Sequence, residues 1–367
     1  MNVVIAGGGS AGHVEPALNI ADALRRRNSD VCVSLVGTSR GLETRLVPAR
    51  GYPLDLIPPV PLPRRPTVEL LRVPDRLISA VRAALGVLDA RRADVVVGVG
   101  GYVALPVYVA ARRRSVPVVI HEANARAGLA NRVGARFAAA VATSYPQTEL
   151  RRSVLTGIPL RQAIVDLNRT AARPEASAHF GLRAQRPTLL VSGGSQGARR
   201  LNEATVGVAS VLGDLGLQVL HATGPGQYDA VVAGLAAQGL AGDAPPYVVR
   251  PFVDRMDLAY AAADLMLCRA GAMTVAEVTA VGLPAVFVPL PHGNGEQRLN
   301  AAHVVASGGA LHVDDEALDQ DWLRAQVLPL LADPNRLAEM SRASRASGHR
   351  DAADEVAELV ERAAAAR

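Results

Sequence analysis

Apolar runs alternate with amphipathic stretches along the whole chain. Short runs of Val, Ile, Leu and Ala recur, and many of them end in a turn that contains Gly, Ser or Pro. Between the runs, stretches such as "PALNIADALRRR" and "AMTVAEVTAVG" place apolar residues three or four positions apart, which is the period of a helix. This alternation of strands and helices predicts α/β domains with parallel sheets.

The expected strands fall into two sets, one in each half of the chain. In the first half we expect strands near residues 3–6, 31–36, 95–99, 117–120 and 139–142. In the second half we expect them near residues 188–191, 217–221, 247–250, 264–267 and 285–288.

The two halves begin in the same way. "NVVIAGGGSAGH" opens the chain, and "PTLLVSGGSQGARRLN" occupies residues 187–202. Each is an apolar run, a glycine-rich turn and a predicted helix. The predicted fold class is α/β, with two Rossmann-like domains whose parallel sheets face each other across a cleft. We assign residues 1–160 to the first domain, 161–345 to the second and 346–367 to a C-terminal helix able to pack back on the first.

Composition fits a soluble globular protein of two domains: 367 residues, 49% hydrophobic and 20% charged. Cys32 and Cys268 lie in apolar runs and are expected to be buried thiols in a reducing compartment. No leader is expected, because residue 1 leads directly into a predicted strand, and the long uncharged run 95–111 is interrupted by glycines and a proline. A cytosolic protein is the expectation.

The charged residues disfavour some reaction types and indicate the kind of partner. All 39 basic residues are arginine, so P-loop and Schiff-base chemistry, which depend on lysine, are disfavoured. Residues 1–160 hold 21 Arg against 11 acidic residues, a net +10, whereas the remainder is net −5. The basic half is expected to meet phosphates, nucleic acid or an anionic membrane surface.

The opening turn "GGGSAGHVEP" fits G-x-G-x-x-G at Gly7, Gly9 and Gly12. A dinucleotide site also needs an acid after the second strand, and none is there; Arg40 keeps an NADP site open as an alternative. His13 follows the last glycine and is a candidate general base. The alternative is a histidine that only orders the loop.

Two further clusters follow apolar runs of the first half, "GVGGY" and "HEAN". Tyr102, Glu122 and Asn124 provide a hydroxyl, an acceptor and an amide, a set suited to a polyhydroxyl ligand. Hydrogen bonding within the loops is the alternative for each.

In the second half, "SGGSQGARR" directs backbone N–H groups and Ser195 at one point, which predicts a diphosphate site; a plain turn is the alternative. Glu277 is a candidate acceptor for ribose hydroxyls, although Thr274 and Glu277 also fit a capping box. Glu296, Gln297 and Asn300 are candidates for sugar hydroxyls. The "VDDE" run at 313–316 fits a solvated acidic turn better than a metal site, and no metal site is predicted.

Taken together, these segments resemble the MurG-type glycosyltransferases of peptidoglycan synthesis. The resemblance rests on eight segments that run in the family's order from residue 7 to 301: "GGGSAGHVEP", "GVGGY", "HEAN", "GIPLR", "GGSQGAR", "PFVDRM", "RAGAMTVAE" and "HGNGEQRLNA". It implies the GT-B fold and an inverting transfer of N-acetylglucosamine (GlcNAc) from UDP-GlcNAc to the 4-hydroxyl of the N-acetylmuramoyl sugar of lipid I. The β-1,4-linked product would be lipid II.

The resemblance also implies roles for individual residues. His13 would be the base, with Glu122 and Tyr102 near the acceptor. The donor would be bound by Ser10, Ala11, Gly12, Asn124, Arg161, Ser195, Gln196, Gly197, Val253, Ala272, Met273, Thr274, Val275, Ala276, Glu277, Glu296, Gln297 and Asn300. Ser10–Gly12 and Glu296 depart from the residues common in the family, which leaves the sugar contact of Glu296 open.

The family works on a membrane lipid, which would explain the basic first half. Arg64, Arg65, Arg72, Arg76 and Arg82 are expected to lie on anionic headgroups at the cytoplasmic face of the bacterial membrane, unless they form only a solvated charged face. No metal or cofactor and no nucleic acid are expected; other cell-wall synthesis proteins are candidate partners. The alternatives are a GT-B transferase with another acceptor, an epimerase-like hydrolase of sugar nucleotides, and a non-enzymatic nucleotide-binding regulator.

Overall fold

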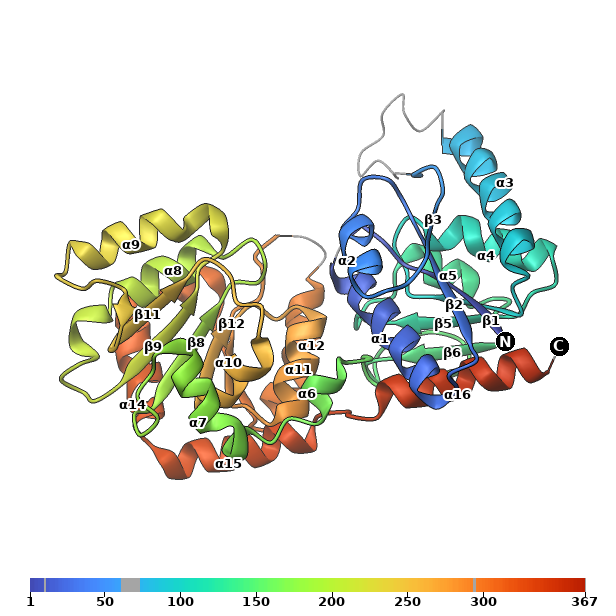
Figure 1. The fold of residues 1–367 in the computed structure, drawn as a ribbon. Helices are drawn as coiled ribbons and strands as arrows, with labels where there is room; N and C mark the ends of the chain where they lie inside the picture. The colour runs from blue at the N-terminus through green and yellow to red at the C-terminus, as the bar shows by residue number, and fades with distance from the viewer. Residues whose placement is uncertain (10, 61–72, 293–294, 367) are drawn as a thin grey trace. The chain divides into compact units, whose positions relative to one another are not determined.

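The computed structural model describes residues 1–9, 11–60, 73–292 and 295–366, which form two compact units. Unit 1 comprises Met1–Arg161 and His349–Arg367, and unit 2 comprises Gln162–Gly348. Each unit is a sheet covered by helices (Figure 1).

The sheet of unit 1 has seven parallel strands in the order β3-β2-β1-β4-β5-β6-β7. The strands are β1 (Asn2–Ala6), β2 (Cys32–Gly37), β3 (Leu54–Leu56), β4 (Val95–Gly98), β5 (Val118–Glu122), β6 (Ala140–Thr143) and β7 (Ser153–Leu155). The helices are α1 (Ala11–Arg27), α2 (Glu43–Ala49), α3 (Val73–Arg91), α4 (Ala104–Arg113), α5 (Leu129–Gly134) and α16 (Ala352–Ala365).

Alternate residues of the strands in unit 1 pack on opposite faces of the sheet. On one face, Val3 and Ile5 of β1 share a core with α1, α2 and α16. On the other, Val4 and Ala6 share a core with α3 and α4. Because both faces are covered, the strands are almost wholly apolar, as their sequences suggested.

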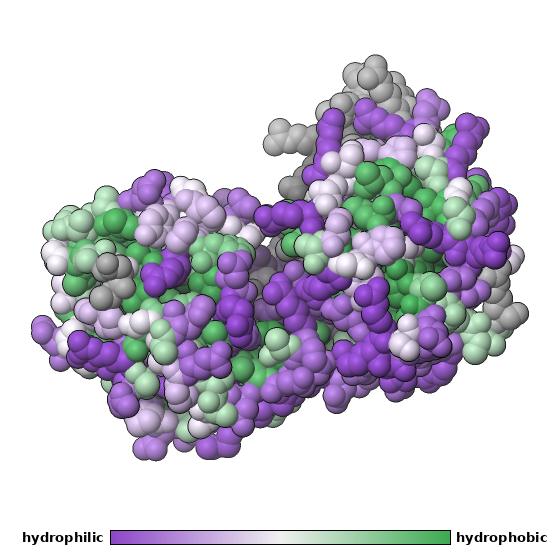
Figure 2. All heavy atoms as spheres, in the orientation of Figure 1, coloured by the Kyte–Doolittle hydropathy of each residue, from purple (hydrophilic) through white to green (hydrophobic). Residues whose placement is uncertain are grey.

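The last helix, α16, belongs to unit 1. Val356 and Val360 on its apolar face are buried in the core with α1. Its outer face is hydrophilic (Figure 2), and Asp354 and Glu361 form ion pairs there with Arg26 and Arg27 at the end of α1.

Unit 2 repeats this arrangement with strand order β10-β11-β9-β8-β12-β13-β14, in which only β10 is antiparallel. The strands are β8 (Thr188–Ser192), β9 (Gln218–Ala222), β10 (Asp243–Ala244), β11 (Tyr247–Arg250), β12 (Leu265–Cys268), β13 (Ala285–Phe287) and β14 (Ala310–His312). The helices are α6 (Gln162–Val165), α7 (Arg169–Phe180), α8 (Arg199–Val206), α9 (Tyr228–Ala236), α10 (Met256–Ala262), α11 (Ala272–Val281), α12 (Glu296–Ala306), α13 (Gln320–Trp322), α14 (Leu328–Leu331) and α15 (Pro334–Ala346). Three short 3-10 segments, η2 (Ala209–Val211), η3 (Pro225–Gln227) and η4 (Asp315–Ala317), and the π-helix η5 (Leu323–Val327) lie among them.

The prediction of two Rossmann-like α/β domains is confirmed, and all ten expected strands are present. In both sheets the strand order reverses beside the first strand of the unit, between β1 and β4 and between β8 and β12. Ligands of such sheets bind at the carboxyl ends of the strands at this reversal. Both glycine-rich turns follow the first strand, so each lies at the reversal of its own sheet.

Candidate active site

Unit 2 has a cavity of about 150 Å³ at the carboxyl ends of its central strands. Six segments supply its walls: the end of β8 with the following turn, the end of β9 with the residues after it, the loop after β11, α10, β12 and the first turns of α11. The lining residues are Ser192, Gly194, Ser195, Ala222, Gly224, Pro251, Phe252, Val253, Met256, Tyr260, Met266, Thr274 and Glu277.

The turn between β8 and α8 is built from glycines for steric reasons. Gly194 and Gly197 have φ of +84° and +75°, a conformation that favours glycine. A Cβ on Gly197 would overlap the carbonyl oxygen of Thr223. Ser195 and Gln196 are exposed between these glycines, so the turn presents polar atoms at the surface beside the cavity.

Helix α8 begins directly after this turn, and no described side chain caps it. Its N-cap, Ala198, has no polar side-chain atom to offer the first N–H groups. Backbone N–H groups and the helix dipole therefore favour an anion at this position. The predicted diphosphate site and the cavity lie together in unit 2.

Glu277 lies on the cavity wall, where the hydroxyl of Tyr260 donates a 2.7 Å hydrogen bond to its Oε2. The capping-box alternative is wrong: α11 begins at Ala272 with Gly271 as N-cap, which places Thr274 inside the helix. Glu277 therefore does not act as part of a capping box, and its carboxylate on the cavity wall is oriented by a tyrosine from α10.

Of the remaining residues expected at the nucleotide, Val253 and Thr274 line the cavity. The side chain of Val275 is buried on the core side of α11. Ala272, Met273 and Ala276 belong to the same first turns of α11, where backbone atoms are the groups they can offer.

The residues expected at the sugar lie on α12 and differ in exposure. Gln297 accepts a 3.0 Å hydrogen bond from the Leu290 N–H through Oε1. Glu296 is the first residue of α12. Asn300 has no exposed surface, and its Nδ2 donates to the carbonyl oxygen of Ala270 at 3.4 Å. Asn300 thus joins α12 to the loop after β12.

In unit 1, His13 lies in the first turn of α1 beside the turn after β4. A Cβ on Gly100 would lie 3.4 Å from the imidazole Nε2, and one on Gly101 would lie 3.6 Å from Nδ1. These two glycines have φ of +90° and +81°. Tyr102, which follows them, is half exposed. The structure therefore brings His13 and "GVGGY" together. Ser10 lies outside the described residues; Ala11 begins α1, and Gly12 follows it.

Glu122 is buried at the end of β5, and its carboxylate is held by its own loop. It accepts hydrogen bonds from the Asn124 N–H at 3.0 Å, the Gly128 N–H at 2.9 Å and Asn131 Nδ2 at 2.9 Å. Burial raises the pKa of Glu122 above its usual value, and these bonds offset part of that shift. The contacts give Glu122 a role in shaping the loop that carries Asn124.

Arg161 is oriented by α1. Its Nε and terminal nitrogen donate to the two carboxylate oxygens of Glu15 at 3.0 and 2.7 Å, and Arg50 contacts the same carboxylate at 3.3 Å. This bidentate geometry fixes the guanidinium plane. Glu15 lies two residues after His13, so α1 positions both His13 and Arg161.

The NADP alternative requires a diphosphate at the opening turn. There the Gly9 N–H donates instead to the carboxylate of Glu43 at 2.8 Å. An internal carboxylate at this position opposes a bound phosphate, and the structure therefore disfavours that alternative.

In the acidic run at 313–316, Asp314 and Glu316 are exposed to solvent, as expected of a solvated turn, and two of the acids also pair with arginines. Asp315 forms a 2.6 Å ion pair with Arg269, and Asp314 pairs with Arg298. Within the described ranges, no group of three or more His, Cys, Asp or Glu side chains is arranged to hold a metal ion.

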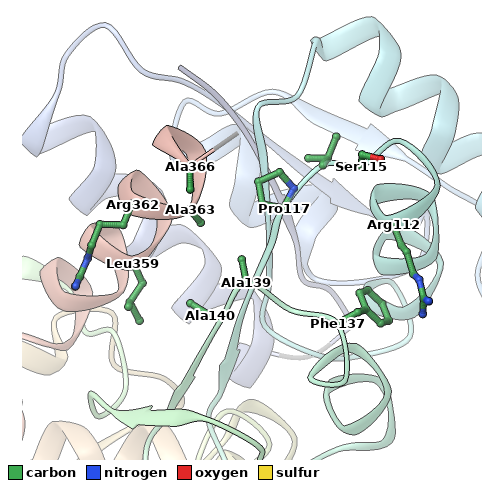
Figure 3. Close-up of a pocket in the computed structure, with 11 residues that line it drawn as sticks. Arg112, Ser115, Pro117, Phe137, Ala139, Ala140, Leu359, Arg362, Ala363 and Ala366 are labelled. Atoms are coloured by element: carbon green, nitrogen blue, oxygen red, sulfur yellow. The ribbon is translucent and has the colours of Figure 1, made fainter.

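A larger cavity, of about 590 Å³, lies in unit 1 at the ends of the strands that are opposite to the glycine turn (Figure 3). Pro117 and Ala139 on its wall immediately precede β5 and β6, so this is the amino end of the strands. Its lining is largely apolar, with Arg112 lying over the ring of Phe137 at 5.1 Å. This cavity is larger than the one in unit 2, but no residue of either glycine turn lines it, so it is not the candidate active site.

Three residues of these two regions were not singled out from the sequence. Tyr260 and Phe252 line the cavity of unit 2, and Glu43 contacts the opening turn. Tyr260 lies in the apolar stretch "MDLAYAAADL" and gives no polar signal there. Phe252 belongs to "PFVDRM", in which only Val253 was assigned.

Comparison with known proteins assigns both units to the domains of one protein family. The glycosyltransferase family 28 N-terminal domain matches residues 3–143, and the C-terminal domain of the same family matches residues 188–356. Together these matches span most of the chain, and the boundary between them falls where one unit ends and the other begins.

Individual proteins of this family match the chain from end to end. A Streptomyces avermitilis protein named UDP-N-acetylglucosamine–N-acetylmuramyl-(pentapeptide) pyrophosphoryl-undecaprenol N-acetylglucosamine transferase is 60% identical over 367 residues, 100% of this chain and 99% of that protein. A Streptomyces coelicolor protein of the same name is 59% identical, with the same coverage. The crystal structure of Acinetobacter baumannii MurG is 31% identical, with a TM-score of 0.79 over 98% of this chain and 99% of that one. The resemblance predicted from the eight segments is confirmed, and the chain belongs to glycosyltransferase family 28, among the MurG proteins.

Proposed function

We propose that this protein transfers GlcNAc from UDP-GlcNAc to the 4-hydroxyl of the N-acetylmuramoyl sugar of lipid I, with inversion, to form lipid II. One observation carries the proposal: the cavity of unit 2 combines a glycine turn before a helix that no described side chain caps with an oriented acceptor, Glu277. A diphosphate joined to a ribose needs these two features side by side. The names of the end-to-end relatives supply the sugar and the acceptor.

In this proposal unit 2 binds the donor. The N–H groups of Ser195–Gly197 and the start of α8 bind the diphosphate. Glu277, held by Tyr260, accepts the ribose hydroxyls, and backbone atoms of Val253 contact the uracil. Gln297 binds the sugar hydroxyls, with Glu296 beside it, and Asn300 fixes the position of α12.

Unit 1 then supplies the acceptor side of the reaction. His13 removes the proton from the attacking hydroxyl, whose oxygen forms a bond to the anomeric carbon while the bond to UDP breaks. The negative charge that develops on UDP is stabilised by the helix N-terminus and the backbone N–H groups. Asn124 and Arg161 close on the donor sugar, and Tyr102 lies near the acceptor. That the two units face each other across a cleft stays a prediction.

The proposed reaction uses no metal or other cofactor. Its charge stabilisation comes from groups of the protein that are already in place. Turnover should therefore be the same in excess EDTA as in Mg²⁺, and a loss of turnover in EDTA that Mg²⁺ restores would contradict this part of the proposal.

The acceptor lipid implies a membrane surface, and we place the protein at the cytoplasmic face. No helix in the described part of the chain is long and apolar enough to cross a bilayer. Helix α3 has an exposed Ile78 between Arg76 and the exposed Arg82, while Arg64, Arg65 and Arg72 lie outside the described residues. An apolar side chain flanked by arginines suits an anionic lipid surface.

Vesicle binding tests this surface. Neutralising Arg76 and Arg82, alone and together with Arg64, Arg65 and Arg72, should weaken co-sedimentation with phosphatidylglycerol vesicles. Neutralising Arg336 and Arg342, on α15 of unit 2, is the control. Unchanged co-sedimentation of the α3 variants would discard the surface.

One assay tests the reaction itself: purified protein, radiolabelled UDP-GlcNAc and a lipid I analogue. The proposal predicts that label moves to the lipid and that UDP is released only when lipid I is present. UDP release without an acceptor would favour the hydrolase alternative, and transfer to a different glycolipid would favour another acceptor. Binding of UDP-GlcNAc without turnover would favour the regulator.

A further inference from the structure

Glu43 is a fully buried carboxylate at the start of α2. Its Oε2 accepts a 2.8 Å hydrogen bond from the Gly9 N–H. Its Oε1 accepts bonds from the N–H of Thr38 at 2.8 Å and from the Thr38 hydroxyl at 3.0 Å. No described arginine pairs with it, so two backbone N–H groups and one hydroxyl stabilise its negative charge.

Three glycines enclose this side chain. A Cβ on Gly8 would lie 2.6 Å from Glu43 Oε1, and a Cβ on Gly37 or Gly41 would overlap other atoms of the Glu43 side chain. All three glycines leave room for one carboxylate. Chain segments after β1 and β2 are thus built around this residue.

The arrangement is that of a phosphate-binding turn whose anion belongs to the protein. Gly9 has a φ of +91° and directs its N–H at a negative oxygen, as glycine-rich turns do toward phosphates. Burial raises the pKa of Glu43, but hydrogen bonds from Gly9 and Thr38 outweigh it, and the pKa lies below its usual value. The carboxylate is therefore ionised throughout the neutral range.

The same turn is joined to His13 through the loop after β4. A Cβ on Gly101 would lie 2.9 Å from the Gly8 carbonyl oxygen and 3.6 Å from His13 Nδ1. A shift of residues 8 and 9 would therefore change the position of Gly101, against which the imidazole rests.

We propose that Glu43 is a positioning residue of the transfer reaction, whose carboxylate fills the anion site of the opening turn and holds His13 against Gly100 and Gly101. Because the carboxylate of Glu43 already occupies this site, the opening turn does not bind the diphosphate of the donor, which we assign to unit 2. The inference rests on the proposed function for its catalytic part, and the filled anion site can be tested without it.

Glu43→Gln is the first test. An amide keeps the size of the side chain, but its NH₂ group would face the N–H of Gly9 or Thr38, so one bond is lost. We expect kcat to fall roughly 10- to 100-fold, as for a displaced catalytic group, while the Kd for UDP stays within about twofold of wild type. Glu149→Gln, the same change at an exposed position of unit 1, should leave both quantities unchanged.

Glu43→Ala with formate is the second test. Removing the side chain opens the anion site, and formate presents the missing carboxylate. Formate should restore turnover in a saturable way, whereas chloride at equal ionic strength should not. In ¹³C NMR, labelled formate should bind Glu43→Ala and not the wild-type protein.

Several results would overturn the proposal: wild-type kcat in Glu43→Gln, an equal loss of UDP affinity and turnover, or no formate binding by a folded Glu43→Ala protein. If Glu43→Ala does not fold, Thr38→Val replaces it, because that change removes only the hydroxyl donor. The proposal then requires kcat to fall with the Kd for UDP unchanged, and unchanged kcat refutes it. If the wild-type protein transfers no GlcNAc, the proposed function fails while formate binding still decides whether the anion site exists.

Discussion

The glycine turns of the two units occupy the same place in the fold and differ in what lies beside them. Each follows the first strand of its sheet and leads into a helix at the point where the strand order reverses. In unit 1 the Gly9 N–H binds the carboxylate of Glu43. In unit 2 no described side chain caps the helix that follows Gly197, and a cavity lies beside it. The same motif is therefore filled by a side chain of the protein in unit 1 and lies beside a cavity in unit 2.

The two units also differ in the kind of functional group that they carry. Groups suited to a nucleotide, such as Glu277 and Tyr260, lie in unit 2. The candidate base, His13, lies in unit 1, together with Glu15 and the arginine that Glu15 orients. Substitutions in unit 1 should therefore change kcat, and substitutions in unit 2 should change donor affinity.

Replacement of His13 should have the largest effect. We expect His13→Ala to lower kcat by about 10²- to 10⁴-fold, the range for loss of a general base, while the Kd for UDP changes little. Steady-state kinetics and calorimetry measure the two quantities. Turnover close to wild type would remove His13 as the base.

The second change tests the turn of unit 2. Gly197→Ala places a Cβ against the Thr223 carbonyl at a φ of +75°, and we expect it to cost about 3 kcal/mol of unfolding free energy and to abolish UDP binding. Gly181→Ala is the matched control, because Gly181 has a φ of +71° with nothing within 4 Å of its Cβ position. Similar destabilisation by both would show that the backbone conformation, and not the contact, is responsible.

Glu277 should have the third largest effect. Glu277→Ala removes a charged acceptor, and we expect a loss of about 2 kcal/mol in UDP affinity, measured by titration with UDP and, as a control, with uracil. Tyr260→Phe should lose less, because it removes one hydrogen bond to the carboxylate and keeps the carboxylate itself. Equal affinity of Glu277→Ala for UDP would place the ribose elsewhere.

A pH effect on unit 2 should be the smallest. His221 is buried in β9 between Tyr247 and Asn202, and burial lowers its pKa from 6.5 to about 3. As the pH falls, His221 is protonated in the unfolded chain at a higher pH than in the folded protein. Protonation therefore favours unfolding, and unit 2 loses stability as the pH falls below about 6.5. The loss between pH 7 and 5.5 should be about 1 kcal/mol.

Hydrogen exchange of the β8 and β9 amides measures this loss. In His221→Gln the dependence should flatten, whereas in His179→Gln, an exposed histidine of the same unit, it should remain. An unchanged dependence in His221→Gln would assign the loss to other groups.

The central part of each sheet could be predicted from sequence because its strands are buried on both faces. Runs such as Val95–Gly98 and Leu265–Cys268 are continuously apolar. The strands missed, including Leu54–Leu56, Ser153–Leu155 and Ala310–His312, have three residues each and lie at or near sheet edges. So short a segment shows no periodicity, and its pairing with a neighbouring strand makes it a strand.

Candidate site residues stand out in the sequence where they lie in a glycine-rich turn or directly after an apolar run, as His13, Glu122 and Ser195 do. Glu43 stands in a polar segment, "GTSRGLETRL", where a glutamate gives no signal. Its contacts form only when the fold brings Gly9 and Thr38 to the same carboxylate. Tyr260 was missed for the corresponding reason, because its partner lies 17 residues away.

A crystal structure of the protein with UDP tests the central claim most directly. The account predicts the diphosphate on the N–H groups of residues 195–197 and the start of α8, with the carboxylate of Glu43 still bound to Gly9. A diphosphate bound at residues 7–12, with Glu43 displaced and the turn of unit 2 empty, would contradict it.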